Sequence, residues 1–368
     1  MHGTKILEEA DRVMTVCNSC RYCEGLCAVF PAMEMRRSFS DGDLNYFANL
    51  CHACGACYTD CQFSPPHEFN VNVPQTLAIA RGESYAAYAW PRAFAGMFAR
   101  NGLLISLIAA LSVAAFILGF AAWHDRQILF GVHTGPGAFY KLMPHNAMAA
   151  LFGAVFLYAV VALIMGVRAF WRDIGEPIGQ NADAGSLWQA IRDAGSLRYL
   201  DGGGGGCFNE DDRPTDRRKL YHHFTFYGFL LCFASTSVAT LYHYLLAREA
   251  PYPWWDAPVV LGTLGGIGLL VGPIGLLAGR WKRDPVLADQ ERMGMDTAFI
   301  AMLFLTSLTG MALLLLRATS AMGPLLALHL GVVFALFLTM PYGKFVHGIY
   351  RFVALVRYAQ ERRMMGQV

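Results

Sequence analysis

Charged side chains are scarce in this sequence of 368 residues: Asp, Glu, Lys and Arg together make up 15% of it, and the formal net charge is only +2. No stripe of basic residues stands out, so nucleic acid is not expected as a partner. No GxGxxG motif follows a predicted strand, and the glycine run at 202–206 lacks the Gly-Lys-Ser/Thr of a phosphate-binding loop. The sequence therefore shows no fingerprint for nicotinamide or flavin binding.

Cysteine, in contrast, is concentrated near the N-terminus, where the pattern CxxCxxCxxxC occurs twice within the first 61 residues. Three cysteines spaced by two residues wrap a loop around one 4Fe-4S cluster, while the fourth points away and ligates the other cluster. The spacing therefore predicts two 4Fe-4S clusters with crossed ligand sets. The first cysteine set is Cys17, Cys20, Cys23 and Cys61, and the second cysteine set is Cys51, Cys54, Cys57 and Cys27.

Zinc and disulfide bonds are the other common roles of clustered cysteines, and neither fits this pattern. A zinc site takes four ligands, often as two CxxC pairs, and has no use for a third cysteine at the same step. Disulfides need an oxidising compartment, and the N-terminus shows no secretory signal. One departure from the common bacterial motif is that Ala28 and Gln62, rather than proline, follow the fourth cysteines.

The segment between the two motifs favours a helical domain, because it lacks the alternation of β-branched residues that a strand would show. Ser40 or Asp41 is placed to cap a helix that leads into the second motif. Further helices are expected over residues 5–15 and 74–88. Residues 1–90 are thus predicted to form a cytoplasmic α-helical ferredoxin domain.

After about residue 100 the composition changes, and uncharged apolar stretches long enough to cross a bilayer recur to the C-terminus. The predicted fold class is therefore all-α, with the ferredoxin domain followed by a six-helix transmembrane bundle. This membrane domain covers residues 91–368 and includes a cytoplasmic glycine-rich loop at 171–221. The predicted spans lie near residues 102–123, 145–167, 222–246, 258–279, 296–316 and 324–347.

Lysine and arginine in the loops predict the orientation. Most of them fall at 168–219, 280–292 and 357–363, on the same side as the N-terminal domain. The opposite loops hold only Arg126, Lys141, Arg248 and Arg317. The positive-inside rule therefore places the clusters and both termini in the cytoplasm.

Histidines near both ends of two predicted spans suggest haem. His329 and His347 in the last span are eighteen residues apart, which returns to the same helix face after roughly 27 Å. The third span carries His222 and His223 at its inner end and His243 at its outer end. Because the two spans run in opposite directions, we expect two pairs of axial ligands for one or two b-type haems. The outer pair is His243 with His329, and the inner pair is His222 or His223 with His347.

Simpler roles are predicted for the remaining polar features. His124, His133 and His145 are expected to be loop or interfacial histidines, since none has an obvious partner on the same helix face. The glycine run is interpreted as a flexible linker, with a surface that approaches a cluster or meets a partner as the alternative. Whether Cys207, directly after this run, ligates a cluster stays open.

Several stretches together resemble the tricarballylate or citrate utilization protein B family over essentially the full length. They are CRYCEGLCAVFPAM, CHACGACYTDCQFSPPHEFNVN, GGGGGC, DRRKLYHHFTFYGFLLCFAST and APYPWW. The resemblance implies a bacterial inner-membrane protein with iron-sulfur clusters and haem. Such a protein reoxidises the FAD of a soluble partner, tricarballylate dehydrogenase, and delivers the electrons to quinone. Whether the partner's substrate is tricarballylate, citrate or a related acid is left open.

Two other classes of function remain as alternatives. One is a quinol-oxidising subunit akin to the cytochrome arms of nitrate or heterodisulfide reductase complexes, which would feed a terminal reductase. The other is a transporter or membrane sensor with regulatory clusters. We expect no buried acidic or basic side chains within the spans, and their absence would argue against an ion path.

Overall fold

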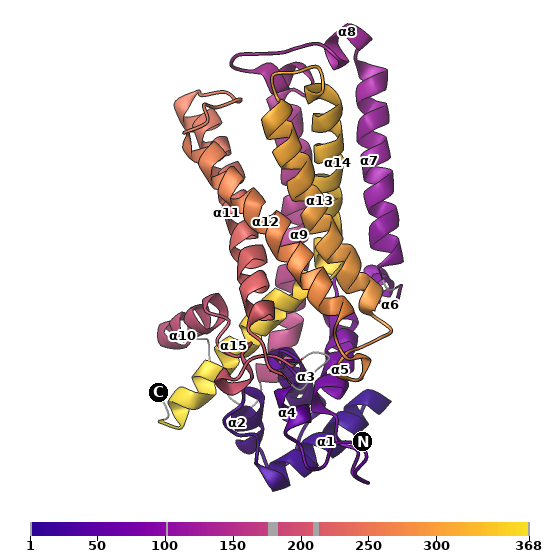
Figure 1. The fold of residues 1–368 in the computed structure, drawn as a ribbon, viewed down its shortest axis with the longest axis vertical. Coiled ribbons are helices and arrows are strands. Elements are labelled where there is room, and N and C mark those ends of the chain that lie inside the picture. The colour runs from indigo at the N-terminus through magenta and orange to yellow at the C-terminus, as the bar shows by residue number, and fades with distance from the viewer. Residues whose placement is uncertain (1, 101, 176–182, 209–212, 367–368) are drawn as a thin grey trace.

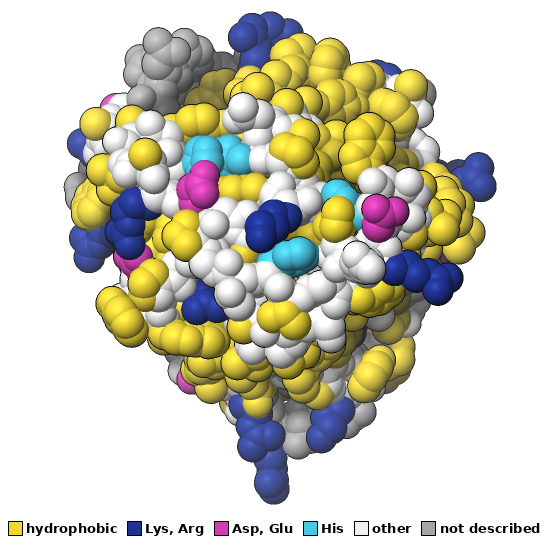
Figure 2. Space-filling model, turned by 90° about the horizontal axis from the view of Figure 1, so that it is seen from above, with side chains coloured by type: hydrophobic (Ala, Val, Ile, Leu, Met, Phe, Trp, Pro, Cys, Tyr) yellow, Lys and Arg dark blue, Asp and Glu magenta, His cyan; other side chains and the backbone are white. Residues whose placement is uncertain are grey.

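The computed structural model describes residues 2–100, 102–175, 183–208 and 213–366, and the regular elements within these ranges are all helices. A small helical domain with both cysteine motifs lies at one end of a bundle of long helices (Figure 1). The predicted all-α class is thus confirmed. The opposite end of the bundle presents hydrophobic side chains with scattered charged and histidine side chains between them (Figure 2).

Five helices form the N-terminal domain, and the helix that leads into the second motif starts at the expected capping residue. The Ser40 side chain accepts a hydrogen bond from the Asp43 backbone, while the Asp43 carboxylate accepts one from Ser40, which is a complete capping box. The first helix continues five residues beyond the predicted end because nothing interrupts it before Arg21, which adopts a left-handed conformation. The helices are α1 (Lys5–Cys20), α2 (Val29–Glu34), α3 (Asp41–Leu50), α4 (Ala56–Thr59) and α5 (Val73–Tyr88).

Six helices in the described part of the chain are long and apolar enough to cross a bilayer, as predicted. They are α7 (Leu103–Trp123), α9 (His145–Gly175), α11 (Arg217–Leu246), α12 (Ala257–Trp281), α13 (Met293–Leu316) and α14 (Met322–Thr339). The short helices of the connections are α6 (Gly96–Ala99), α8 (Arg126–Leu129) and α10 (Ala184–Gly195), with the 3₁₀ turns η1 (Arg92–Phe94), η2 (Ala138–Lys141), η3 (Gly202–Gly204) and η4 (Pro285–Leu287).

The last span does not reach residue 347 as expected. Helix α14 ends at Thr339 and passes into the 3₁₀ turn η5 (Met340–Tyr342), because Pro341 cannot donate the backbone hydrogen bond that would continue an α-helix. After an extended Gly343, the chain starts a new helix, α15 (Val346–Met364). His329 and His347 therefore lie on two different helices, and the expectation that one helix carries both is wrong.

Helix α15 crosses beneath the bundle and packs against the cysteine domain (Figure 1). Its Glu361, only 6% exposed, accepts hydrogen bonds from Arg36 at 2.6 Å and from the Tyr46 hydroxyl at 2.9 Å. Arg357, one turn earlier, also donates to Glu361 at 2.9 Å. A buried ionic network thus joins the C-terminal helix to α2–α3 of the N-terminal domain.

Helices α11 and α12 pack closely because glycines face each other along their contact. A side chain added at Gly228 would come within 2.9 Å of the backbone oxygen of Gly265, and one at Gly268 within 2.8 Å of that of Phe224. Small residues allow the backbones of membrane helices to approach in this way. This contact fixes the inner end of α11, which carries His222 and His223.

Candidate functional site

The side chains of the first cysteine set meet around one small cavity. Burial and, after it, the charges of Cys23, Cys61 and Cys20 together raise the pKa of Cys17 to about 12. All four thiols also line a cavity of about 250 Å³ between α1 and the second motif. The fold therefore brings Cys61 from the second motif to the three cysteines of the first.

The second cysteine set meets in the same crossed manner. Burial raises the pKa of Cys57 well above its ordinary value, and its neighbouring thiolates Cys54, Cys27 and Cys51 act in the same direction. Burial is also the main cause that raises the pKa of Cys27, followed by the charges of Cys54 and Cys51. Both groups in space coincide with the expected ligand sets, while ligation itself stays a prediction.

The donor chemistry of both sets fits iron-sulfur clusters. Among the described residues no three His, Cys, Asp or Glu side chains are close enough together to hold a single metal ion. The ligands of a 4Fe-4S cluster surround a four-iron body, so they lie farther apart than the ligands of one ion. Thiols with raised pKa values are neutral in the free protein, and binding of iron would release their protons.

The glycine run does not act only as a linker, because it covers the second cysteine set. Gly202 packs on Ala56, because a Cβ added at Gly202 would lie only 3.1 Å from the Ala56 Cβ. The Phe208 backbone N–H donates to the Cys54 carbonyl at 2.8 Å. Cys207 is 1% exposed, and its charge is one of the causes, after burial, that raise the pKa of Cys54. The alternative of a surface that approaches a cluster fits this segment; residues 209–212 of the predicted loop lie outside the described residues.

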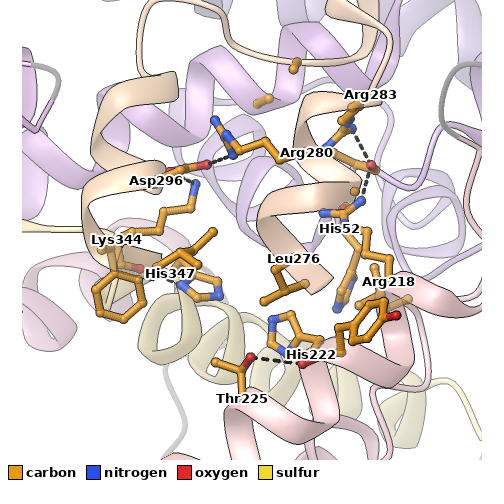
Figure 3. Close-up of a pocket in the computed structure, with 18 of the residues that line it drawn as sticks. His52, Arg218, His222, Thr225, Leu276, Arg280, Arg283, Asp296, Lys344 and His347 are labelled. Atoms are coloured by element: carbon orange, nitrogen blue, oxygen red, sulfur yellow. Dashed lines mark hydrogen bonds and ion pairs between the residues drawn. The ribbon is translucent and has the colours of Figure 1, made fainter. Parts of the chain in front are cut away.

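A second, larger cavity of about 1230 Å³ lies between the cysteine domain and the inner ends of α11, α12 and α13. His52, between Cys51 and Cys54 of the second motif, forms part of its wall (Figure 3). His222 from α11 and His347 from α15 face the same space. Asp296, 18% exposed, accepts from Arg280 at 2.7 Å and Lys344 at 2.9 Å across it.

The mostly buried Asp296 at the start of α13 corrects one expectation from the sequence. We expected no buried acidic or basic side chains in the spans, yet this carboxylate, with Arg280 at the end of α12, forms a paired ionic group at the inner end of the bundle. Because the carboxylate is held by both Arg280 and Lys344 at the helix end, we interpret the group as a structural contact rather than an ion path.

The spacing of the inner histidine pair fits two ligands of one haem iron. The ring centres of His222 and His347 lie 6.1 Å apart with the rings nearly perpendicular, at 74°. An iron bound at about 2 Å by one nitrogen of each ring would hold the ring centres roughly 6 Å apart.

The hydrogen bond of the His347 ring agrees with such a role. His347 Nδ1 donates to the Lys344 carbonyl at 2.5 Å, which leaves Nε2 as the free electron-pair donor, the usual arrangement of a metal-bound histidine. His222 Nδ1 is buried without a hydrogen-bond partner. The residues present therefore fit a b-type haem, and His222 rather than His223 faces His347; His223 instead lies against Tyr227.

The expected outer pair does not form. His243 stacks on His145 from α9, with ring centres 3.4 Å apart and an interplanar angle of 15°, while His329 Nδ1 bonds the Thr309 hydroxyl at 3.0 Å. The structure thus brings His243 together with His145 rather than with His329, because α9 lies beside the outer end of α11, a position that helix periodicity does not reveal. Ligation of a haem by any of these outer histidines stays a prediction.

Of the other outer histidines, His124 bonds the carbonyl of Leu142 at 2.7 Å, and His133 bonds that of Ile128 in the short connecting helix α8 at 2.8 Å. These contacts match their expected loop role. His145 was expected to share that role, but its ring belongs to the stack with His243. Only its place at the start of a predicted span could have drawn attention to it.

A helical domain with two four-cysteine groups, joined to six apolar helices, defines a multi-pass membrane protein of the iron-sulfur electron-transfer class. Residues 10–87 match the family model described as citrate utilization protein B Fer4-like domain, and residues 96–367 match the one described as citrate utilization protein B. The chain is 52% identical to "Citrate utilization protein B" of Escherichia coli over 96% of its own length and 92% of that protein's. It belongs to the citrate utilization protein B family. No solved structure matches the chain.

Proposed function

We propose that the chain reoxidises the reduced FAD of a soluble tricarballylate-type dehydrogenase and passes the electrons to the quinone pool. Two 4Fe-4S clusters and one b-type haem, when bound, supply carriers that accept and release single electrons. The observation that carries the proposal is the shared pocket. His52, which adjoins Cys51 of the second set, borders the same cavity as His222 and His347, so the proposed carriers form one continuous series.

The first cysteine set faces the surface at which a soluble flavoprotein would dock. Cys20 is partly exposed, and the adjacent Tyr22 is 74% exposed. Cys51 and Cys54 of the second set are buried at 6% and 8% exposure. The first set is therefore the proposed acceptor for electrons from the partner, and the second set is the proposed link to the membrane.

The larger cavity offers a suitable place for quinone close to the histidine pair. Leu276, Phe299 and Leu303 from α12 and α13 give one part of it an apolar lining, which suits an isoprenoid quinone that enters from the bilayer. We place the protein in the bacterial inner membrane, with the clusters and both termini in the cytoplasm. The relative's name points to citrate, so we propose a tricarboxylate as the partner's substrate.

The test uses the full-length protein purified from its native membrane in detergent. We expect iron and acid-labile sulfide for two 4Fe-4S clusters, a b-type haem spectrum after dithionite, and a co-purifying flavoprotein. Reduced flavoprotein should then reduce a quinone analogue only in the presence of this chain. A preparation without haem that keeps full quinone reduction would contradict the haem part, and a co-purifying terminal reductase would instead favour quinol oxidation.

A further inference from the structure

Four arginines from separate elements surround the backbone of the second cysteine motif. Arg81 and Arg351 donate to the carbonyl oxygen of Cys51 at 2.5 and 2.8 Å. Arg218 and Arg283 donate to the carbonyl oxygen of Ala53 at 2.8 and 2.6 Å. We refer to these side chains as the arginine group: Arg81 of α5, Arg218 of α11, Arg283 after α12, and Arg351 of α15.

The charge of the arginine group is not balanced by acidic side chains. Its hydrogen bonds go to backbone carbonyls, and none of its members has a carboxylate partner among the described residues. Burial and, after it, the charges of neighbouring arginines lower the pKa of Arg283 to about 9 and that of Arg351 to about 10. The acids on this side are committed elsewhere, since Asp201 pairs with Lys219 at 3.3 Å and Asp296 with Arg280.

Buried positive charge without a counterion is costly, so an anion is expected beside it. The thiolates of the second cysteine set are in the right place. After burial and a neighbouring arginine, Tyr85 and Cys51 are the groups that raise the pKa of Arg351, and Arg218 lowers the pKa of Cys54 against the larger effect of burial. All four arginines are thus held at the backbone of this motif, and the charges of two of them reach its thiols.

The first cysteine set has a different electrostatic environment. The pKa of Cys23 is raised to about 12. Burial is the largest cause, and the charges of Cys61 and Cys20 and then the carboxylate of Asp60 follow. Asp60 is an exposed acid in the second motif, directly before Cys61. One set thus faces four guanidinium groups, while the other has an acidic neighbour.

We propose that the arginine group raises the reduction potential of the cluster held by the second cysteine set above that of the cluster held by the first. The proposal rests on the proposed function, because it assumes both clusters. A one-electron reduction adds one negative charge to a cluster, and net charge and hydrogen bonding are among the causes that set its potential.

Two effects oppose each other at the second set. Burial disfavours added negative charge, while the four guanidinium groups stabilise it through the same low-dielectric surroundings, where their field is weakly screened. The proposal takes the effect of the four guanidinium groups to be the larger one, and the redox titration below tests this. The arginine group thereby stabilises an electron on the side of the pocket that holds His222 and His347.

The proposal can be tested by a redox titration of the purified full-length protein, followed by electron paramagnetic resonance. Variants Cys20→Ser and Cys54→Ser assign each signal to one set. We expect the higher midpoint potential for the second set in the unmodified protein. Arg351→Gln should lower that midpoint alone, Arg351→Lys should largely preserve it, and Asp60→Asn should raise only the midpoint of the first set.

Arg126→Gln is the matched control, because it removes an exposed positive charge at the opposite end of the bundle and should change neither midpoint. If Arg351→Gln does not fold, Arg218→Gln takes its place. The proposal is overturned if the first set has the higher midpoint, or if the folded glutamine variant leaves the second midpoint unchanged. Fewer than two clusters in the unmodified protein would instead overturn the proposed function.

Discussion

At the scale of single residues, the glycine run works through backbone conformations that other residues rarely adopt. Gly206 has a φ of 108°, and a Cβ there would lie 2.8 Å from the backbone nitrogen of Thr215. Gly206→Ala should cost about 1–3 kcal/mol in strain and loosen the cover over the second cysteine set. We expect faster loss of visible cluster absorbance in air and a lower melting temperature.

Gly205→Ala provides the control for that variant, since Gly205 has an ordinary φ and an added Cβ would meet only the Gly202 carbonyl at 3.9 Å. It should bleach at the rate of the unmodified protein. Equal bleaching of both alanine variants and the unmodified protein would show that the loop does not shield the cluster.

The inner histidines allow a second prediction at this scale. His347→Ala and His222→Ala each remove one proposed axial nitrogen, so we expect loss of the low-spin b-type spectrum and reduced haem content in the purified protein. His223→Ala should retain both, because His223 lies against Tyr227 and not in the pocket. Measurement of pyridine haemochrome absorbance per protein decides between these outcomes, and an unchanged haem content in His347→Ala would exclude His347 as a ligand.

At the scale of elements, helix α15 joins the two domains through Glu361. Loss of Glu361 leaves the buried Arg357 without its acidic partner, while Arg36 keeps Asp43, so Glu361→Gln should destabilise this contact by about 3–5 kcal/mol. Arg36 and Arg357 would then lack their shared carboxylate. We expect faster hydrogen exchange in α15 and α3, measured by mass spectrometry on the detergent-solubilised protein.

Arg363→Gln, two residues further along α15, is the matched control for that prediction. Arg363 is half exposed and pairs with the equally exposed Asp183 at 3.2 Å, and such surface pairs contribute little to stability. Its exchange should match that of the unmodified protein. If Glu361→Gln exchanges no faster than this control, the network does not hold the domains together.

The elements also show what the sequence could and could not predict. The six spans and the helix after Ser40 were predicted because they depend on local apolar length and on a capping side chain. Pro341 could have indicated the end of the last span, but the span was predicted from its apolar length, which continues past the proline. The stacking of His145 on His243 depends on how α9 packs beside α11, and no local pattern encodes that position.

The cysteine sets and the arginine group illustrate the same difference. The spacing of the cysteines specifies which thiols can share a cluster, so a crossed grouping could be predicted before any fold was known. The arginines come from positions 81, 218, 283 and 351, and only the tertiary fold brings them together. From the sequence, two of the four contributed only to the predicted membrane orientation, and the other two went unnoticed.

At the scale of the whole molecule, the loops predict one orientation in the membrane. Lysine and arginine are concentrated at the end of the bundle that carries the cysteine domain and α15, so this end should face the cytoplasm. A green fluorescent protein fused after residue 368 should therefore fluoresce, because it folds in the cytoplasm. Alkaline phosphatase fused after Glu249, in the opposite loop between α11 and α12, should be active because it requires an oxidising compartment.

The matched control is a phosphatase fusion after Asp284, between α12 and α13, which should be inactive. An active fusion at Asp284 together with an inactive one at Glu249 would reverse the orientation, and the clusters would then be out of reach of a cytoplasmic flavoprotein.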